Sequence, residues 1–150
     1  NEGVVGFVLS ESFKRYTISS LVEGWSGDNF DIQIGGPVER NSLHFIHKYA
    51  DLEGAIPLSK DLWWGGDFEQ LKEWNKLGKL DSNSIKFFLG YAGWTAEQLQ
   101  EELEQKSWIV LPLSIDIFSV KSSDLWQKIL IQKGGEYKQI AKYPIDPQLN

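Results

Sequence analysis

The sequence predicts an α+β fold in a single domain, and three observations lead to this class. Short apolar stretches that favour strands are mixed with amphipathic stretches that favour helices, without the regular alternation of a doubly wound fold. The 150 residues suffice for one domain with a sizeable core. The 7 Trp, 5 Tyr and 8 Phe residues supply large side chains for that core, and no linker or repeat divides the chain.

Strands are predicted from short apolar runs and from alternation. Residues 3–10 (GVVGFVLS) predict a buried strand, and residues 30–34 (FDIQI) predict a half-buried strand that stops at a tight turn. Residues 42–50 (SLHFIHKYA) alternate, so this strand has two distinct faces. One face carries Leu43, Phe45 and His47, and the other carries His44, Ile46 and Lys48. Further strands or extended stretches are predicted at residues 55–66, 84–90, 108–112 and 137–144.

Helices are predicted where a capping residue precedes an apolar stripe. Thr17 is placed to begin a short helix that Gly24 ends. Asp67 is the expected N-cap of a longer helix that stops at Gly78. Its apolar stripe includes Phe68, Leu71 and Leu77. Another helix is predicted over residues 122–135, with Leu125, Trp126, Ile129 and Leu130 inward.

A helix after Thr95 has the most complete set of signals. Thr95 and Gln98 form a capping-box pattern, and the glutamates that follow lie mainly off the apolar stripe. Glu102 is four residues before Lys106, which predicts an ion pair along the helix. These glutamates therefore indicate a solvated acidic face, with paired catalytic carboxylates as the alternative.

The composition bears on the kind of site that the protein can hold. The sequence has no Cys, which excludes disulfides, thiolate nucleophiles and cysteine zinc sites. Its net charge of −6 disfavours direct DNA binding, because nucleic-acid affinity rests on cations that neutralise phosphates. His44 and His47 lie on opposite faces of their strand, so neither a metal nor a cofactor is expected. No apolar run reaches the length of a membrane span, and we expect a cytoplasmic protein.

Two glycine-rich segments are the candidate binding elements. Gly35-Gly36-Pro37 predicts a sharp turn that can approach another backbone or a ligand closely. Gly90-Tyr91-Ala92-Gly93-Trp94 predicts a tight turn between a strand and a helix. The second segment holds no Lys or Arg and precedes a glutamate, which argues against phosphate binding. Both segments are explained by packing, with ligand binding as the alternative.

Three blocks occur in a fixed order along the chain: GVVGFVLS, IGGPVERNSLHFIH and FFLGYAGWTAEQLQEELEQKSWIV. Together they resemble the YqgE/AlgH family of bacterial proteins, whose function is largely unassigned. The family pattern matches Gly6 to Leu9, Gly35 to Val38 with Leu43 and His44, and Gly90 to Trp94 with Gln98, Leu99, Glu102 and Trp108. Ser10, Glu11 and Ser12 depart from it, since the family commonly has an asparagine, a basic residue and a proline there.

The resemblance implies one domain over residues 1–150, in which bent mixed sheets form a pseudo-barrel with about three to four helices packed on it. It also implies that the family's N-terminal segment, which includes a strand, is missing here. One branch of the family is labelled a putative transcriptional regulator. Nothing in the sequence supplies a helix-turn-helix or a basic face for that role.

The leading hypothesis is a non-enzymatic regulatory or interaction module that acts through an unknown protein partner or a small ligand. We expect its binding patch to combine Gly35, Gly36, Pro37, His44, Gly90, Tyr91, Gly93 and Trp94. The alternatives are a hydrolase or isomerase that uses His44 as a general base, and a transcriptional regulator. No other catalytic residue is assigned.

Overall fold

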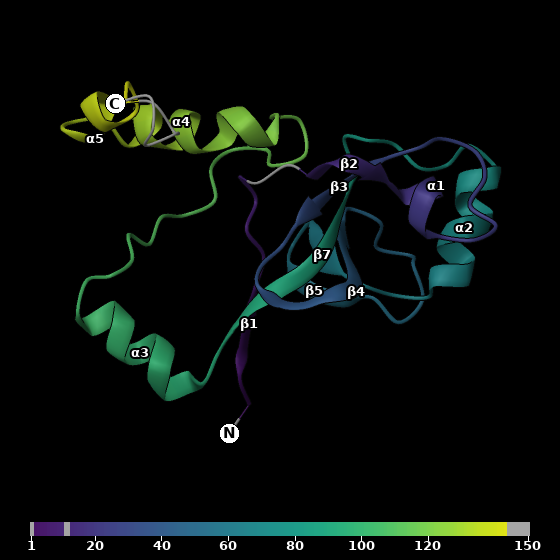
Figure 1. Cartoon of the computed structure of the whole chain (residues 1–150), viewed down its shortest axis with the longest axis horizontal. Helices are drawn as coiled ribbons and strands as arrows, with labels where there is room; N and C mark the ends of the chain where they lie inside the picture. Colours follow the sequence, from purple (N-terminus) through teal and green to yellow (C-terminus); the bar gives the residue numbers. More distant parts are fainter. Residues whose placement is uncertain (1, 11–12, 144–150) are drawn as a thin grey trace.

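The computed structural model describes residues 2–10 and 13–143. Its strands are β1 (Val4–Gly6), β2 (Phe13–Thr17), β3 (Asp31–Ile34), β4 (Val38–His47), β5 (Ile56–Ser59), β6 (Leu62–Trp64) and β7 (Ile85–Trp94). Its helices are α1 (Ile18–Leu21), α2 (Phe68–Lys76), α3 (Ala96–Glu104), α4 (Ser122–Lys133) and α5 (Tyr137–Ile140). The predicted α+β class is confirmed (Figure 1).

The strands form one mixed sheet around β7. Its order is β2-β3-β7-β4-β6-β5, and β1 pairs with the C-terminal part of β7. β7 runs parallel to β3 and antiparallel to both β4 and β1. β2 and β5 lie at opposite ends of this order, so the sheet formed by the described residues is open and does not close into the expected pseudo-barrel.

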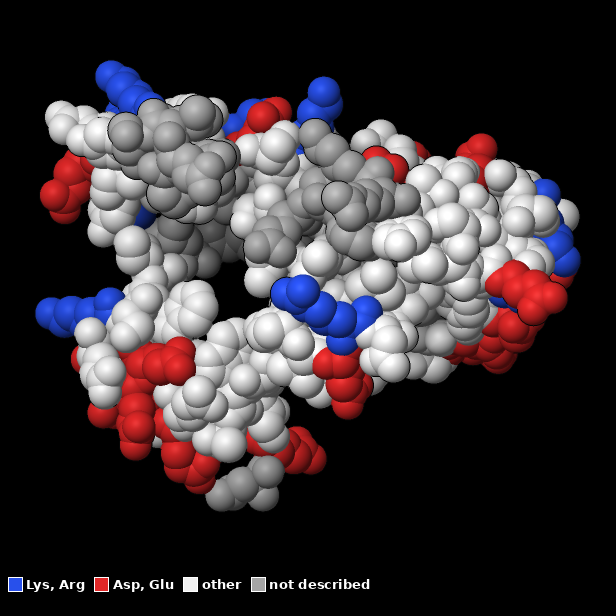
Figure 2. Space-filling model, in the orientation of Figure 1, with Lys and Arg blue, Asp and Glu red and all other residues white. Residues whose placement is uncertain are grey.

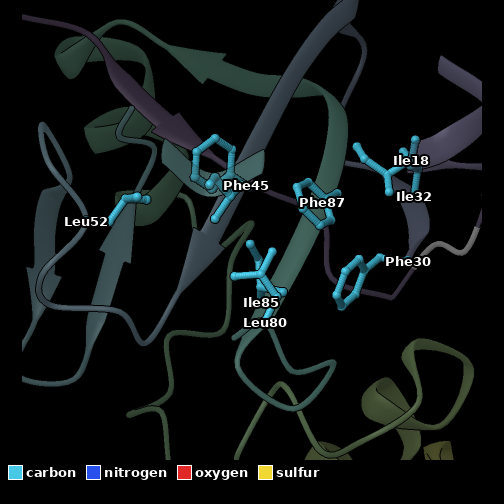
Figure 3. Close-up of a cluster of buried hydrophobic side chains, with 9 residues drawn as sticks. Ile18, Phe30, Ile32, Phe45, Leu52, Leu80, Ile85 and Phe87 are labelled. Carbon is cyan, nitrogen blue, oxygen red and sulfur yellow. The ribbon is translucent and has the colours of Figure 1, made fainter. Parts of the chain in front are cut away.

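The core lies on both faces of the sheet. On one face, α1 and α2 cover a cluster whose buried members are Ile18, Phe30, Ile32, Phe45, Leu52, Leu71, Leu80, Ile85 and Phe87 (Figure 3). The opposite face holds a smaller cluster of Ile46, Phe88, Ile117 and Phe118. The predicted alternation of β4 is confirmed, because Phe45 and Ile46 belong to different clusters.

The strongest helix predictions are confirmed at their N-termini. The Asp67 carboxylate accepts a hydrogen bond from the Gln70 N–H at 3.0 Å, and α2 begins at the next residue, Phe68. In α3, the Thr95 hydroxyl accepts from the Gln98 N–H at 3.1 Å. The predicted α2 stripe is wrong at Leu77, which is exposed because the helix ends one residue before it.

Two strand predictions are wrong, and a third holds only in part. Only Val4–Gly6 of residues 3–10 forms a strand, and Val4 is exposed rather than buried. Residues 108–112 have no strand partner among the described residues. Residues 137–140 form α5 instead of an edge strand, and residue 144 lies outside the described part.

The turn before α5 explains the error in residues 137–140. Gly134 and Gly135 both have positive φ, and they return the chain onto α4. Contacts with α4 then stabilise the short helix, since Gln127 donates to the Ala141 carbonyl at 2.9 Å. The prediction for α4 itself is confirmed, although Trp126 is exposed rather than inward.

Candidate functional site

The segment from Gly90 to Trp94 is the second half of β7 and not the predicted turn. Ala92 and Gly93 pair with Gly6 and Val5 of β1, and Tyr91 pairs with Val38 of β4. Gly90 adopts a φ of +70°, which redirects the strand without ending it. A turn was predicted because glycines usually interrupt strands. Here the absence of a side chain on Gly90 instead allows a second backbone segment to lie close to the strand.

That second backbone is the connection between β3 and β4. A Cβ on Gly36 would overlap the peptide group between Tyr91 and Ala92, and one on Gly35 would overlap the Gly90 carbonyl oxygen. A Cβ on Gly90 would lie 2.7 Å from the Val38 carbonyl oxygen. The Gly35 N–H also donates to the Leu89 carbonyl oxygen at 2.9 Å. Close packing of two chain segments therefore accounts for these glycines.

We call the close approach of the β3–β4 connection to β7 the crossing. It places Tyr91 beside His44, and His44 is the centre of an aromatic cluster. The His44 ring centroid lies 5.6 Å from that of Tyr91, 5.5 Å from that of Phe7 and 6.0 Å from that of Trp64. Burial lowers the pKa of His44, and the negative charge of Glu39 opposes this shift in part. The neutral form of the imidazole therefore predominates at pH 7.

Ser42 is a polar partner of His44 that the sequence reasoning missed. Its hydroxyl oxygen lies 3.0 Å from His44 Nε2, and the imidazole tautomer decides which atom donates. The two residues are two apart on β4, so strand periodicity puts them on one face. The spacing of two residues could have identified Ser42 as a neighbour of His44 from the sequence. Phe7 and Trp64 could not be identified in this way, because they come from remote segments.

A cavity of about 530 Å³ adjoins His44, a volume typical of ligand sites. Trp64 and Phe68 contribute aromatic walls, and glycine backbone forms part of the lining. None of the nine lining residues carries a charge at neutral pH: Leu43, His44, Phe45, Gly54, Ile56, Trp64, Gly65, Gly66 and Phe68. The cavity therefore suits an uncharged ligand.

The predicted patch converges only in part. Gly35, Gly36 and Gly90 meet at the crossing, and Tyr91 and His44 lie next to it. Pro37 is exposed beside this group. The remaining two predicted residues, Gly93 and Trp94, line a different hollow of about 540 Å³ between β1 and the start of α3.

Trp94 instead takes part in a polar clamp on α3. Glu102 Oε2 accepts from the Trp94 indole N–H at 3.1 Å and from the Trp108 indole N–H at 2.7 Å. The two indole rings meet edge to face at 5.7 Å. The predicted Glu102–Lys106 pair is absent from the ion pairs of the described residues, because Glu102 turns to the indoles and α3 ends at Glu104.

This clamp fixes an arm, which we define as α3 and residues 105–113. The arm projects from the sheet, and α3 has no buried residue (Figure 1). After α3, the large apolar residues of the arm are exposed by 37% to 75%: Trp108, Ile109, Val110, Leu111 and Leu113. Acidic side chains gather on α3, at the lower left of Figure 2.

His47 has a structural role next to the cavity, where it links the end of β4 to the residue that follows β6. It is fully buried, its Nε2 lies 2.7 Å from the Gly65 carbonyl oxygen, and its Nδ1 accepts from the Tyr49 N–H at 3.1 Å. These partners fix a neutral tautomer with the proton on Nε2, and burial lowers the pKa of His47. Within residues 2–10 and 13–143, no group of three or more metal-ligating side chains is close enough to hold an ion.

Among the described helices, none has the length and apolarity needed to cross a bilayer. Two solved structures share the fold, each with a TM-score of 0.71 and 21% sequence identity. One is the solution structure of the AlgH protein from Pseudomonas aeruginosa, where the alignment covers 96% of this chain and 79% of that one. The other, a crystal structure of a Corynebacterium diphtheriae protein, is aligned over 94% of this chain and 76% of that one.

Sequence relatives are closer than these structures. A UPF0301 protein of Cytophaga hutchinsonii is 40% identical over 153 aligned positions, which cover 100% of this chain and 84% of the relative. A UPF0301 protein of Bacteroides thetaiotaomicron is 31% identical, over 99% of this chain and 76% of the relative. The AlgH-like family model matches residues 1–138. This protein therefore belongs to the AlgH-like family.

Proposed function

We propose that this protein is an interaction module that binds a polypeptide partner through its arm. The observation that carries the proposal is the exposure of the apolar run from Trp108 to Leu113. An exposed apolar run of this kind marks an interaction site, because leaving it in water costs free energy that a partner removes.

The clamp supports this proposal by fixing the arm before the partner arrives. Glu102 holds Trp94 at the end of β7 and Trp108 at the start of the apolar run, so one carboxylate sets the direction of the arm. A fixed binding segment loses less conformational entropy on association than a mobile one. Pre-organisation therefore favours binding at this surface.

The negative charge of α3 indicates which side chains the partner presents at this surface. Glu97, Glu101 and Glu104 lie on this helix, which precedes the apolar run in the arm. A partner with an apolar centre and a rim of Lys or Arg complements both features. Rim charges act mainly on the association rate, so binding is expected to slow as the salt concentration rises.

A double substitution in the arm tests the proposal. Ile109→Ser with Val110→Ser removes two exposed apolar side chains, and Ile131→Ser removes one from the exposed surface of α4 as a control. We expect a partner recovered from native cells by cross-linking and then purified to bind the control normally and the double variant at least about tenfold more weakly. Equal binding by both variants would contradict the proposal.

Hydrogen exchange on a relative provides a second test. The chain covers 84% of the Cytophaga hutchinsonii relative, which is measured at its full length without a partner. We expect the region aligned with residues 108–113 to exchange rapidly in that protein and to become protected when the partner is added. Protection in the free relative would show that this surface is an internal contact and would overturn the proposal.

The contact between Ser42 and His44 favours a second candidate function, hydrolysis of an uncharged ester. A neutral imidazole 3.0 Å from a hydroxyl can take its proton as the oxygen attacks the ester carbonyl carbon. The imidazolium then returns the proton to the alcohol as the ester C–O bond breaks, and water hydrolyses the acyl-serine. The test is covalent labelling by a fluorophosphonate, followed by mass spectrometry of the modified peptide. We expect labelling at Ser42 that His44→Gln abolishes, and an unlabelled Ser42 would exclude this function.

A further inference from the structure

The edge of β4 that faces away from β7 is only partly covered. β6 pairs with β4 at Ile46 and His47, and the Gly65 N–H donates to the Phe45 carbonyl oxygen at 2.9 Å. The chain then leaves the sheet at Gly65 and Gly66, whose φ angles are +66° and +126°. In the described part of the chain, no strand pairs with this edge from Val38 to His44.

The exposed part of the edge offers both kinds of backbone hydrogen-bonding group. In an antiparallel strand, the N–H and C=O groups of alternate residues point to the same side. Phe45 uses its carbonyl toward β6, so Leu43, two residues earlier, directs its N–H and C=O to the same edge. Leu43 can therefore form both hydrogen bonds of a strand pair.

The cavity of about 530 Å³ occupies the position where β6 would continue along β4. It is bounded by Leu43, His44 and Phe45 on β4 and by Gly65 and Gly66, where the chain turns away. Its lining includes residues from both faces of the sheet, since Leu43 packs against one core cluster and Trp64 packs against the other. These lining residues surround the position that a longer β6 would take.

We propose that this edge binds an extended, uncharged peptide segment of a partner protein, which adds to β4 as a strand in line with β6. The backbone of the segment pairs with Leu43, and the existing ladder between β4 and β6 sets its position. The site lies apart from the arm, so it is a second binding surface.

The two faces of the cavity determine which side chains the peptide presents. The residue opposite Leu43 points toward Phe45 and Phe68, which favours an aliphatic side chain. The next residue points toward His44 and Trp64, which favours a hydroxyl or an aromatic ring. Charged side chains are disfavoured on both faces, because burial would remove their water without supplying a counter-charge.

Two model peptides provide the first test. The probe is a hexapeptide of alternating Thr and Val, acetylated at its N-terminus and amidated at its C-terminus. We expect it to shift the Leu43 amide resonance and to slow hydrogen exchange at that amide. The same peptide with alternate amides N-methylated, so that they cannot donate to β4, is expected to bind about tenfold more weakly or worse.

Two tryptophan substitutions on β5 provide the second test. Ile56 lines the cavity and is 53% exposed, whereas Leu58 is 50% exposed on the same strand but does not line the cavity. We expect Ile56→Trp to fill the site and abolish binding of the hexapeptide, and Leu58→Trp to leave it unchanged. Melting curves establish that both variants are folded.

Several results would overturn the proposal. These are the absence of any Leu43 shift at millimolar peptide, equal binding of the N-methylated peptide, or equal binding by the Ile56→Trp variant. A Leu43 shift that follows protein concentration alone would show that a second copy of the chain occupies the edge. The arm substitutions at Ile109 and Val110 are expected to leave hexapeptide binding intact, so failure of one proposal does not imply failure of the other.

Discussion

Replacing Gly36 by alanine tests whether the backbone crossing is as close as the structure indicates. The new Cβ would overlap the peptide group between Tyr91 and Ala92, which belongs to the central strand. A flexible side chain could move away from such an atom, but a backbone held in a ladder on both sides cannot. We therefore place the cost at the upper end of the range for overpacking, about 3 kcal/mol.

The expected change in melting temperature follows from the size of the domain. The unfolding entropy of a chain of 150 residues is about 0.3 kcal/mol per kelvin near the midpoint. A loss of about 3 kcal/mol therefore lowers the melting temperature by about 10 °C. Differential scanning calorimetry measures this shift directly.

Two further glycines separate the overlap from other effects of alanine. Gly78 has a φ of +70° and open space around it, so Gly78→Ala reports the backbone strain alone, about 1 to 2 kcal/mol. A Cβ on Gly93 would lie 3.3 Å from the edge of the Tyr91 ring, which can shift, so Gly93→Ala is expected to cost less than about 1 kcal/mol. A Gly36→Ala protein that melts within error of wild type, or above the Gly78→Ala protein, would refute the close approach.

Three other substitutions test single contacts. Glu102→Leu removes the acceptor of both indole N–H groups, so we expect these protons to exchange faster with solvent. The loss of unfolding free energy should be only about 1 kcal/mol, because Trp108 is half exposed. Because burial lowers the pKa of His47, the unfolded chain binds more protons than the folded chain near and below pH 6.5, so the free energy of unfolding should fall as the pH drops from 7 to 5.5. His47→Gln should weaken this dependence in urea titrations, and the remainder reports His44, whose pKa burial also lowers. The Asn75 amide donates to the carbonyl oxygens of Ser26 and Asp28 at 2.7 and 2.8 Å. Asn75→Asp should therefore lower the free energy of unfolding by about 3 kcal/mol in urea titrations. An unchanged midpoint would contradict the buried contact.

The features that the sequence predicted correctly depend on neighbouring residues. The N-caps at Asp67 and Thr95 are decided within three residues, because the cap side chain bonds to a backbone N–H in the same turn. The alternation from Leu43 to Lys48 is likewise a local consequence of strand geometry. Such features are read from the sequence because no distant segment changes them.

The features that the sequence did not predict depend on segments that are far apart. Gln33 looks like a solvent-facing residue of a half-buried strand, yet it is buried, because Ser122 of α4 covers it and accepts a hydrogen bond. The aromatic cluster around His44 combines Phe7 and Trp64, which no local pattern connects. Only the pairing of β1 with β7, of β7 with β4 and of β4 with β6 brings these rings to one place.

The crossing at Gly36 and Gly90 also determines how the binding proposals must be tested. It sets the position of Tyr91, and Tyr91 packs against His44, so the geometry beside the cavity depends on the crossing. A glycine substitution that abolished ligand binding would therefore leave two explanations, a lost contact or a displaced strand. Ile56→Trp avoids this ambiguity, because Ile56 lies at the far wall of the cavity on β5 and is half exposed. Loss of peptide binding in that variant, with the melting temperature of wild type, would assign the effect to the cavity itself.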